Sequence, residues 1–354
     1  MERKTYLNKL NILASEMMKN EPTPFYNFIK VLCLTTMNMR YEKIAFHKDL
    51  KIHPYILTKN IIEDTINMFR MLCEIDFIED DDKNTADTKY SDLVKKHKIL
   101  WQEIWSRHSY DEFKQFIKLK AMRLEANNLI NKIKGRSCID LGCGNGSFSF
   151  ALISKGAKSV TGIDFGNKSI EYAKNYAKQN KMTPFAKFLV GDIKDIPVEQ
   201  NKFGFAVANG VFHHLPAQDI PLALNEVNRV LEKGGWFWYY VDGKGAISMD
   251  LWDQTVEILS EVNINEIEAH LIPLNIKRAK MVHIMDSSNA TYIHTDWDEV
   301  TNMLKNAGFG NFKRLTGATS TDFDHDTIES DKWGKEKFGS GDLRIICQKI
   351  RNND

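Results

Sequence analysis

Apolar residues repeat along the chain with two different spacings, and the change falls near residue 135. Over about the first 95 residues they recur every three or four positions, as in 25–32 and 62–72, which predicts short amphipathic helices. The same spacing runs from Phe113 through Ile117 and Leu124, and it predicts one long helix over 113–134.

From residue 137 onward, short runs rich in β-branched and aromatic residues alternate with helical segments. This alternation is typical of an α/β fold in which crossover helices connect parallel strands. We predict strands near 137–141, 159–163, 186–190, 203–208, 235–241, 310–316 and 342–349, and helices near 147–155, 167–180, 221–231 and 297–307.

These two regions predict the domain organisation. We expect a helical domain at 1–95, a linker with a lid helix at 96–134, and an α/β domain at 135–350 that an amphipathic insertion interrupts at 248–290. The first domain has two interpretations. An acidic turn at 79–84 suits a winged-helix-like unit, but a helical region for dimerisation or for covering a pocket is favoured, because a DNA-reading helix needs more cations than this segment offers.

Composition excludes several classes of protein. Lys and Arg total 48 against 47 Asp and Glu, a net charge of +1, which argues against a dedicated nucleic-acid coat or membrane-surface protein. No apolar stretch approaches the ~20 residues that span a bilayer, and the N-terminus lacks the apolar core of a secretion signal. Five cysteines without a C-x-x-C pair, and ten histidines without H-E-x-x-H, predict free thiols in a reducing cytoplasm and no metal site.

The strongest chemical signal follows the first predicted strand, where the chain reads Asp140-Leu141-Gly142-Cys143-Gly144-Asn145-Gly146. Glycines let the backbone turn tightly and approach a ligand closely, because they carry no Cβ. The helix that follows offers free N–H groups to a negatively charged group. The spacing of the glycines, with Ser147 where a dinucleotide fingerprint has its last glycine, counts against NAD or FAD.

Three further strands end in polar side chains. Asp164 lies 24 residues after Asp140, and a carboxylate at that strand tip can accept both hydroxyls of a ribose. Asp192 can accept from an adenine amino group while Ile193 packs on the ring, and Asn209 ends the fourth strand. All four positions lie at carboxyl ends of strands, where open α/β sheets bind ligands.

This ordered series resembles the class I S-adenosylmethionine-dependent methyltransferases. Asp140 to Gly146 match that family's D/E-x-G-x-G-x-G motif, and Asp164, Asp192 and Asn209 fall at its ribose, adenine and fourth-strand positions. The resemblance covers about 135–247 well and 295–350 loosely, with Lys233 where proline is common. It is specific for the cofactor and says little about the methyl acceptor.

The resemblance implies a Rossmann-like, seven-stranded sheet with helices on both faces, a mainly helical N-terminal domain and a helical lid insertion. It also implies S-adenosylmethionine as the cofactor. The implied contacts are the loop Gly142, Cys143, Gly144 and Gly146 around the methionine end, Asp140 near its amino group, Asp164 on the ribose, Phe165, Asp192 and Ile193 on the adenine, and Asn209 behind the sulfonium.

Methyl transfer to an O or N atom needs alignment and the removal of a proton, for which histidine has a suitable pKa. His213 and His214 follow the fourth strand directly and are the candidates, although such a pair also serves as a structural helix start. His108 and Tyr110 are candidates for substrate contact, with ordinary packing as the alternative. Arg344 is a candidate for binding an anionic acceptor, with a surface arginine after a turn as the alternative.

Two basic segments also have two interpretations, as a binding surface or as a solvated face. The exposed face of the 113–134 helix is predicted to carry Lys114, Lys118, Lys120, Arg123, Lys132 and Lys134, and cations recur at 277–283 within the insertion. Each is either a collar for an anionic substrate or a solvated face.

The acceptor is narrowed by what the sequence lacks. The fourth strand is not followed by the D/N-P-P-Y/F of DNA amino-methylation, and no cysteine follows a proline as in cytosine methylation. We therefore expect a small metabolite, with an anionic one as an option, no membrane partner, and nucleic acid disfavoured. A protein or RNA acceptor stays open as an alternative. Two other functions also stay open, a catalytically silent binding protein and a nicotinamide-dependent oxidoreductase. For the assembly, we keep open a homodimer through the N-terminal helices.

Overall fold

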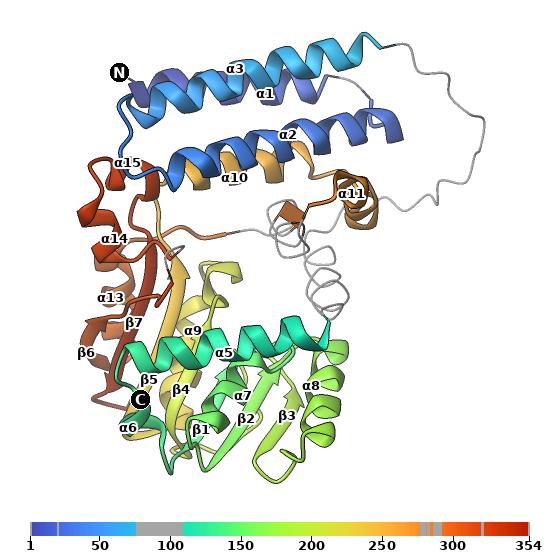
Figure 1. Ribbon diagram of the computed structural model, residues 1–354. Helices are drawn as coiled ribbons and strands as arrows, with labels where there is room; N and C mark the ends of the chain where they lie inside the picture. Colours follow the sequence, from blue (N-terminus) through green and yellow to red (C-terminus); the bar gives the residue numbers. More distant parts are fainter. Residues whose placement is uncertain are drawn as a thin grey trace. The chain divides into compact units, whose positions relative to one another are not determined.

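The computed structural model describes residues 2–19, 21–75, 109–276, 281, 284–285, 292–319 and 322–352 (Figure 1). The chain divides into two compact units, each made of three segments. The first comprises Met1–Leu100, Gly245–Thr291 and Ser330–Gly339, and the second comprises Trp101–Lys244, Tyr292–Glu329 and Ser340–Asp354.

The first unit is helical in its described residues, as predicted for the N-terminal region. Local signals start its helices: the Thr23 hydroxyl accepts from the Tyr26 amide, and Pro24 occupies the first helical turn. Its elements are α1 (Glu2–Met17), α2 (Pro24–Ala45), α3 (Pro54–Cys73), α10 (Ile247–Ile258), α11 (Ile264–Leu271), the 3₁₀ turn η4 (Ile272–Leu274) and α15 (Gly334–Phe338).

The insertion packs with the N-terminal helices. α2 contacts both α10 and α11, and the Asn27 amide donates to Glu266 Oε1 at 2.9 Å. The Tyr41 hydroxyl likewise donates to the Lys337 carbonyl at 2.9 Å, which ties α15 to α2. The domain boundaries expected from the sequence put the insertion in the α/β domain, so they do not include its packing with the N-terminal helices. The acidic turn at 79–84, on which the winged-helix interpretation depends, lies outside the described residues.

The second unit is built on the predicted seven-stranded sheet, and the fold expected from the sequence is confirmed. The strand order is β3-β2-β1-β4-β5-β7-β6, with β7 antiparallel to both of its neighbours and the others parallel where they pair. The strands are β1 (Ser137–Leu141), β2 (Ser159–Asp164), β3 (Ala186–Val190), β4 (Phe203–Asn209), β5 (Leu231–Asp242), β6 (Phe309–Arg314) and β7 (Asp342–Lys349).

Alternating residues of these strands form two buried layers. Ile139 and Ala206 point into a cluster with α9 (Ile220–Val230) and α13 (Trp297–Asn306). Cys138 and Phe205 point the other way, into a cluster with α5 (Tyr110–Ala126) and α7 (Ser147–Ser154), and a separate cluster joins these two helices to α8 (Asn167–Gln179). The remaining short elements are α6 (Ile130–Ile133), η3 (Phe212–His214) and α14 (His325–Ser330).

The segment 113–134, which was predicted as one long helix, forms two helices, so the prediction of a single helix is wrong. α5 ends at Ala126, and Asn128 takes a left-handed conformation with φ of 56°. The Asn127 side chain both donates to the Thr316 carbonyl and accepts from the Thr316 amide, each at 2.9 Å. This tertiary contact fixes the break, which the apolar spacing does not show.

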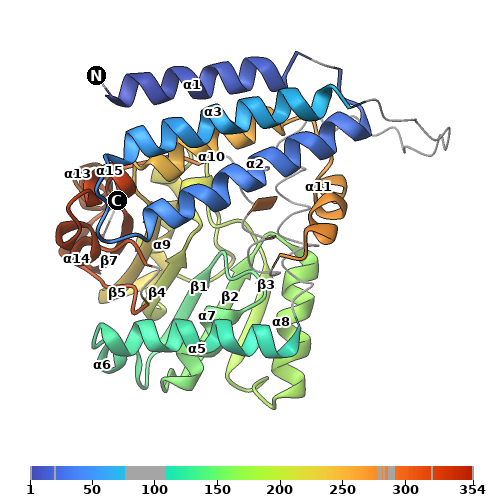
Figure 2. The same cartoon turned by 45° about the horizontal axis from the view of Figure 1, so that its top comes forward.

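The topology brings the ends of five strands to one edge of the sheet. β1 to β5 run parallel where they pair, so their carboxyl ends meet there. Because β7 runs the other way, its first residue, Asp342, lies opposite Asp242 at the end of β5. Figure 2 brings this edge forward.

Candidate active site

The loop after β1 is held in a conformation that favours glycine. Gly142, Gly144 and Gly146 have φ of +64°, +52° and +87°, where an L side chain is strained. A Cβ at Gly142 would lie 2.5 Å from a methyl carbon of Val211, whereas one at Gly144 would meet nothing within 4 Å. Gly142 is therefore required by packing, and Gly144 leaves an open space beside the loop.

Asp164 at the tip of β2 braces this loop. Its Oδ2 accepts from the Gly144 amide at 2.9 Å, and its Oδ1 accepts from the Gly166 amide at 2.8 Å. Burial raises the pKa of this carboxyl, and the two backbone hydrogen bonds oppose the rise. A carboxylate oxygen has two acceptor positions, so Asp164 retains capacity for a ligand hydroxyl.

Asp140 lies deeper in the same loop. Its side chain is 2% exposed and accepts from the Ser149 hydroxyl at 2.7 Å. Burial raises its pKa to about 7, against the hydrogen bonds from Ser149. The neighbouring Cys143 is also buried, and burial raises the pKa of its thiol well above the ordinary value, so it stays a protonated, unreactive side chain.

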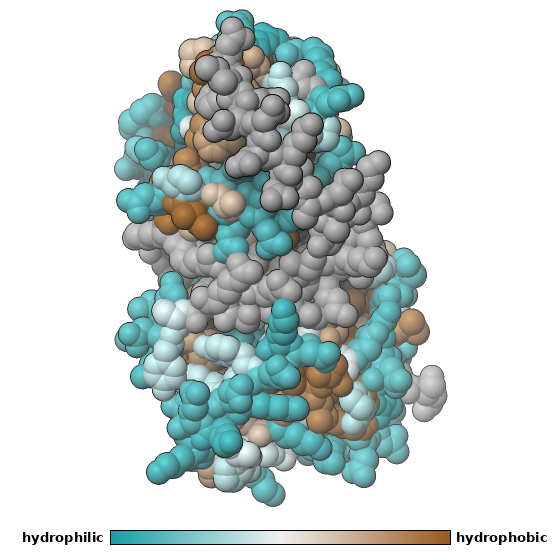
Figure 3. Space-filling model, turned by 90° about the vertical axis from the view of Figure 1, so that its right-hand side faces the viewer, coloured by the Kyte–Doolittle hydropathy of each residue, from teal (hydrophilic) through white to brown (hydrophobic). Residues whose placement is uncertain are grey.

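An apolar surface flanks the tips of β2 and β3. Phe165 is 50% exposed and Val190 49% exposed, while Ile193, shortly after Val190 in sequence, is buried. Figure 3, which views the side on which β3 and α8 lie in Figure 1, shows apolar areas within a mainly hydrophilic surface. Asp192 is exposed, and its Oδ1 accepts from the Lys194 amide at 2.9 Å. An aromatic face and a fixed carboxylate are thus available at these strand tips.

The two histidines differ in their surroundings. His213 is 4% exposed, and its Nδ1 accepts from the Asp242 amide at 3.1 Å. Burial lowers its pKa, which the Asp242 carboxylate and a backbone hydrogen bond at Gly210 oppose. The ring is therefore neutral at pH 7 and carries its proton on Nε2.

His214 is less buried than its neighbour. Its ring lies edge-on to His213 and to Tyr292, with ring centres 4.3 and 4.5 Å apart. Asn209, at the end of β4, accepts from the indole N–H of Trp238 at 3.3 Å. The structure therefore brings Asn209 and both histidines to the end of one strand, as their sequence positions predicted.

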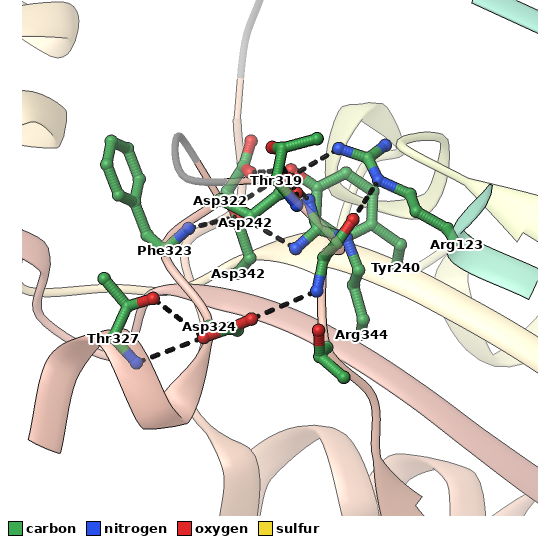
Figure 4. A network of polar contacts seen from close by, with 12 residues as sticks. Arg123, Tyr240, Asp242, Thr319, Asp322, Phe323, Asp324, Thr327, Asp342 and Arg344 are labelled. Carbon is green, nitrogen blue, oxygen red and sulfur yellow. Dashed lines mark hydrogen bonds and ion pairs between the residues drawn. The ribbon is translucent and has the colours of Figure 1, made fainter. Parts of the chain in front are cut away.

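A second polar group, here called the arginine–aspartate cluster, lies at the ends of β5 and β7 (Figure 4). Arg344 donates to Asp342 Oδ2 at 2.9 Å and to Asp322 Oδ1 at 2.8 Å. Arg123 donates to the same Asp322 oxygen at 2.5 Å. The Tyr240 hydroxyl lies 2.8 Å from Asp242 Oδ1 and 3.2 Å from Asp342 Oδ1. The cluster comprises Arg123, Tyr240, Asp242, Asp322, Asp342 and Arg344.

This cluster corrects two expectations. Arg344 is 3% exposed and Arg123 8% exposed, so neither is the accessible cation that the sequence suggested. Although burial opposes it, Arg344 and Arg123 hold the pKa of Asp322 below its usual range. Burial and the two nearby carboxylates raise the pKa of Tyr240 well above its ordinary value. The charges of both arginines are thus compensated within the fold.

Other predicted residues lie apart from this edge or outside the described chain. Tyr110 is 44% exposed at the start of α5, and its hydroxyl hydrogen-bonds with Asn180 Oδ1 at 2.9 Å. His108 and most of the basic segment at 277–283 lie outside the described residues. The prediction missed Asp242, although it ends β5 as Asp164 ends β2, and the same strand-tip rule could have found it.

Taken together, a seven-stranded sheet with one antiparallel strand and a glycine loop braced by the next strand's acid define a class I S-adenosylmethionine-dependent methyltransferase. Residues 132–308, half of the chain, match the family model for a methyltransferase domain. The chain belongs to this methyltransferase family, and its cofactor is S-adenosylmethionine.

Individual relatives match over shorter stretches. The chain is 36% identical over 97 residues to the O-antigen chain terminator bifunctional methyltransferase/kinase WbdD of Escherichia coli, covering 27% of this chain and 13% of that protein. It is 35% identical over 105 residues to the demethylmenaquinone methyltransferase of Staphylococcus aureus (strain MRSA252), covering 29% and 41%. The chain therefore spans less than half the length of these curated relatives.

Solved structures are similar at lower identity. One is the Burkholderia thailandensis 1,6-didemethyltoxoflavin-N1-methyltransferase with bound 1,6-didemethyltoxoflavin and S-adenosylhomocysteine. It is 14% identical with a TM-score of 0.44, covering 75% of this chain and 94% of that one. Separately, no helix in the described part of the chain is long and apolar enough to cross a membrane.

Proposed function

We propose that this methyltransferase acts on an O or N atom of a small molecule at the carboxyl edge of β1 to β5. The observation that carries the proposal is the open space beside Gly144, next to a loop that Asp164 braces. The buried pairing of Arg123 and Arg344 removes one cation from the predicted basic collar, and it also removes the arginine that was predicted to bind an anionic acceptor. This favours a neutral or cationic acceptor over a nucleic acid or a strongly anionic metabolite.

The residues present fit the cofactor. Loop glycines 142, 144 and 146 would hold the methionine end, with Cys143 as a buried support and Asp140 supplying negative charge. Asp164 would hold the ribose, because each of its oxygens keeps a free acceptor position. Phe165, Asp192 and Ile193 would hold the adenine, and Asn209 would line the sulfonium side.

When bound, S-adenosylmethionine supplies a methyl group that is already activated on a sulfonium. The protein has to align the acceptor, exclude water and remove one proton from an O or N acceptor. Of the two histidines, we propose His214 for the proton and His213 as a positioning residue. His213 is buried with hydrogen bonds at the Asp242 amide and at Gly210, whereas His214 is partly exposed.

Tyr110 is not kept as a substrate contact, because its hydroxyl binds Asn180 at the end of α8, apart from the edge where we propose that the acceptor binds. We propose that Arg344 supports the acceptor site only indirectly, because its guanidinium already binds Asp322 and Asp342. We also keep a cytoplasmic localisation within the proposal. Five unpaired cysteines are in keeping with a reducing compartment. Pairing of two chains through the N-terminal helices is a further part of the proposal.

The test is a survey of acceptors with methyl-labelled S-adenosylmethionine and mass-spectrometric detection. We expect label on a small molecule, with kcat reduced about 100-fold in His214→Asn and the acid limb of its pH profile lost. His213→Asn should lower activity less and keep that limb. Label found only on protein or RNA would overturn the acceptor class. Unchanged kcat in His214→Asn would overturn the assignment of the base.

A further inference from the structure

A short extended segment at 292–295 is bound along the carboxyl edge of the sheet. The Ile293 amide donates to the His213 carbonyl at 2.8 Å, and the Thr295 carbonyl accepts from the Lys244 amide at 2.7 Å. Thr295 also forms a parallel bridge with the residue directly after β5. The segment therefore has a fixed position beside the two histidines that follow β4.

The two sides of this segment have different surroundings. Successive side chains of an extended segment point to opposite sides. Ile293 packs against the buried cluster that the sheet forms with α9 and α13. Tyr292 and His294 lie on the other side, where their rings are parallel within 8° and their centres are 6.1 Å apart. Both residues are partly exposed, so this side of the segment presents two parallel rings.

Tyr292 connects these rings to the histidines after β4. Its ring lies edge-on to His213 and to His214, with ring centres 4.7 and 4.5 Å away. Four rings thus lie close together at one edge of the sheet, and we call them the ring row: His213, His214, Tyr292 and His294. Because His214 is the residue proposed to take the proton, the ring row lies beside the place that the acceptor atom must reach.

The chemistry of the ring row favours a flat, uncharged ligand. Its members are one phenol and three imidazoles, and burial lowers the pKa of His213, which is therefore neutral at pH 7. The carboxylate of Asp242, 3.4 Å from the His213 ring, already accepts from the Tyr240 hydroxyl. An ammonium group is attracted to the faces of Trp, Tyr and Phe, of which the row has only Tyr292. An aromatic ring, by contrast, gains from stacked or edge-on contacts with every member.

We propose that the partly exposed rings of the row, Tyr292, His294 and His214, bind the methyl acceptor and select a planar aromatic compound. The inference rests on the proposed function, in which the acceptor binds at the carboxyl edge of β1 to β5. Contact with Tyr292 holds the acceptor's ring beside His214. The acceptor's O or N atom bonds to the methyl carbon as the bond from that carbon to sulfur breaks, and the displaced proton passes to the imidazole of His214.

The test measures the binding of small ring compounds to the protein saturated with S-adenosylhomocysteine, which has no methyl group to transfer. Phenol and cyclohexanol both carry a hydroxyl and differ in whether the ring is flat, and cyclohexylamine supplies an aliphatic ammonium group. Ligand-observed NMR gives the three affinities. We expect phenol to bind about 10-fold more tightly than either of the other compounds.

Three variants locate the binding. Tyr292→Leu keeps an apolar side chain but removes the ring, so phenol binding should weaken about 10-fold. Tyr292→Phe keeps the ring and should bind phenol within about twofold of the wild type. Phe185→Leu is the matched control, because it removes a 49% exposed ring just before β3, at the opposite edge of the sheet. All three should bind S-adenosylhomocysteine as the wild type does, which shows that they are folded.

The outcomes separate this inference from the proposed function. Equal binding of phenol and cyclohexanol, binding of neither, or tighter binding of cyclohexylamine overturns the inference. Unchanged phenol binding in Tyr292→Leu overturns it too, as does an equal loss in Tyr292→Phe, because the hydroxyl rather than the ring is then responsible. A saturated acceptor found in the labelled survey overturns the inference and leaves the proposed function intact. Label on protein or RNA alone contradicts the proposed function itself.

Discussion

Buried aspartates at two places near one edge of the sheet differ in the groups that bind them, and Asp322 differs from Asp140 and Asp164 in the direction of its pKa shift. At the tips of β1 and β2, Asp140 and Asp164 bind a hydroxyl and backbone amides, and burial raises the pKa of both carboxyls. In the arginine–aspartate cluster, Asp322 binds two guanidinium groups, which hold its pKa low despite burial.

Whether a buried carboxylate has a cationic partner determines what each place can do. Charge that is balanced within the fold contributes to stability and leaves little for a ligand. A buried carboxylate without a cationic partner lowers the stability of the fold, and a positively charged ligand group that binds it can offset that loss. The tips of β1 and β2 therefore suit cofactor binding, and the cluster at β5 and β7 suits structural support.

Removing the shared carboxylate of the cluster should have the largest effect. Asp322→Ala leaves Arg123 and Arg344 buried without their common partner, and we expect a loss of about 3–5 kcal/mol in unfolding free energy. Because the pKa of Asp322 is lowered in the fold, its contribution is present at neutral pH and is lost as pH falls below about 4. Denaturant titrations of the wild type and the variant at pH 7 and pH 4 measure the loss of unfolding free energy and its dependence on pH. A loss below 1 kcal/mol at pH 7 would contradict the structural role.

The glycine loop should show the reverse pattern, with binding affected more than stability. Gly144→Ala places a Cβ in the open space beside the loop, and we expect S-adenosylhomocysteine affinity to fall about 100-fold, or roughly 3 kcal/mol. Gly135→Ala is the control, because it also has positive φ and an open Cβ position. Both variants should lose about 1–2 kcal/mol of stability from backbone strain. Calorimetric titration of both variants would show equal affinities if the loop did not hold the ligand.

Neutralising Asp140 should stabilise the protein without ligand. The folded-state pKa is about 7 and the unfolded value about 4, so the folded state binds more protons between these values. Stability therefore falls as pH rises from about 4 to 7, and the penalty is complete above 7. We expect Asp140→Asn to gain on the order of 4 kcal/mol at pH 8, which corresponds to a difference of about three between the two pKa values, and nothing at pH 4. Thermal unfolding at both pH values checks this, and a loss at pH 8 would contradict it.

Asp192 should give the smallest effect, because it is exposed. We expect Asp192→Ala to weaken S-adenosylhomocysteine binding about 5- to 10-fold, near the value of one hydrogen bond. Its stability should change by less than about 0.5 kcal/mol. Asp195→Ala, an exposed acid three residues later, should change neither quantity. Identical affinities in these two variants would remove Asp192 from the adenine site.

The sequence predicted the regions whose signals are local. Strand tips ending in Asp140, Asp164 and Asp192 follow short apolar runs, and each lies where the alternation of strands and helices predicted. β5 begins at Leu231 rather than near 235, because its pairing with β4 contains a register shift between Phe203 and Phe205. Apolar alternation does not report such an irregularity.

Long-range pairing could not be predicted in the same way. Arginines are usually exposed, and Arg123 is buried through Asp322, 199 residues away. The break after α5 depends on the contact between Asn127 and Thr316, which are 189 residues apart. Lys120, which is partly buried, appeared as one of several surface cations because a single helix face does not reveal what packs against its flank.

The central claim is that the loop at 142–146 and Asp164 hold S-adenosylmethionine. The most direct measurement is the shift in melting temperature with S-adenosylhomocysteine and with NAD, for the wild type and for Asp164→Ala, each against its own ligand-free midpoint. At a hundredfold excess over Kd, binding contributes about 2.7 kcal/mol, which is a shift of a few degrees. We predict that shift for the wild type with S-adenosylhomocysteine alone. A shift with NAD, or an undiminished S-adenosylhomocysteine shift in Asp164→Ala, would contradict the account.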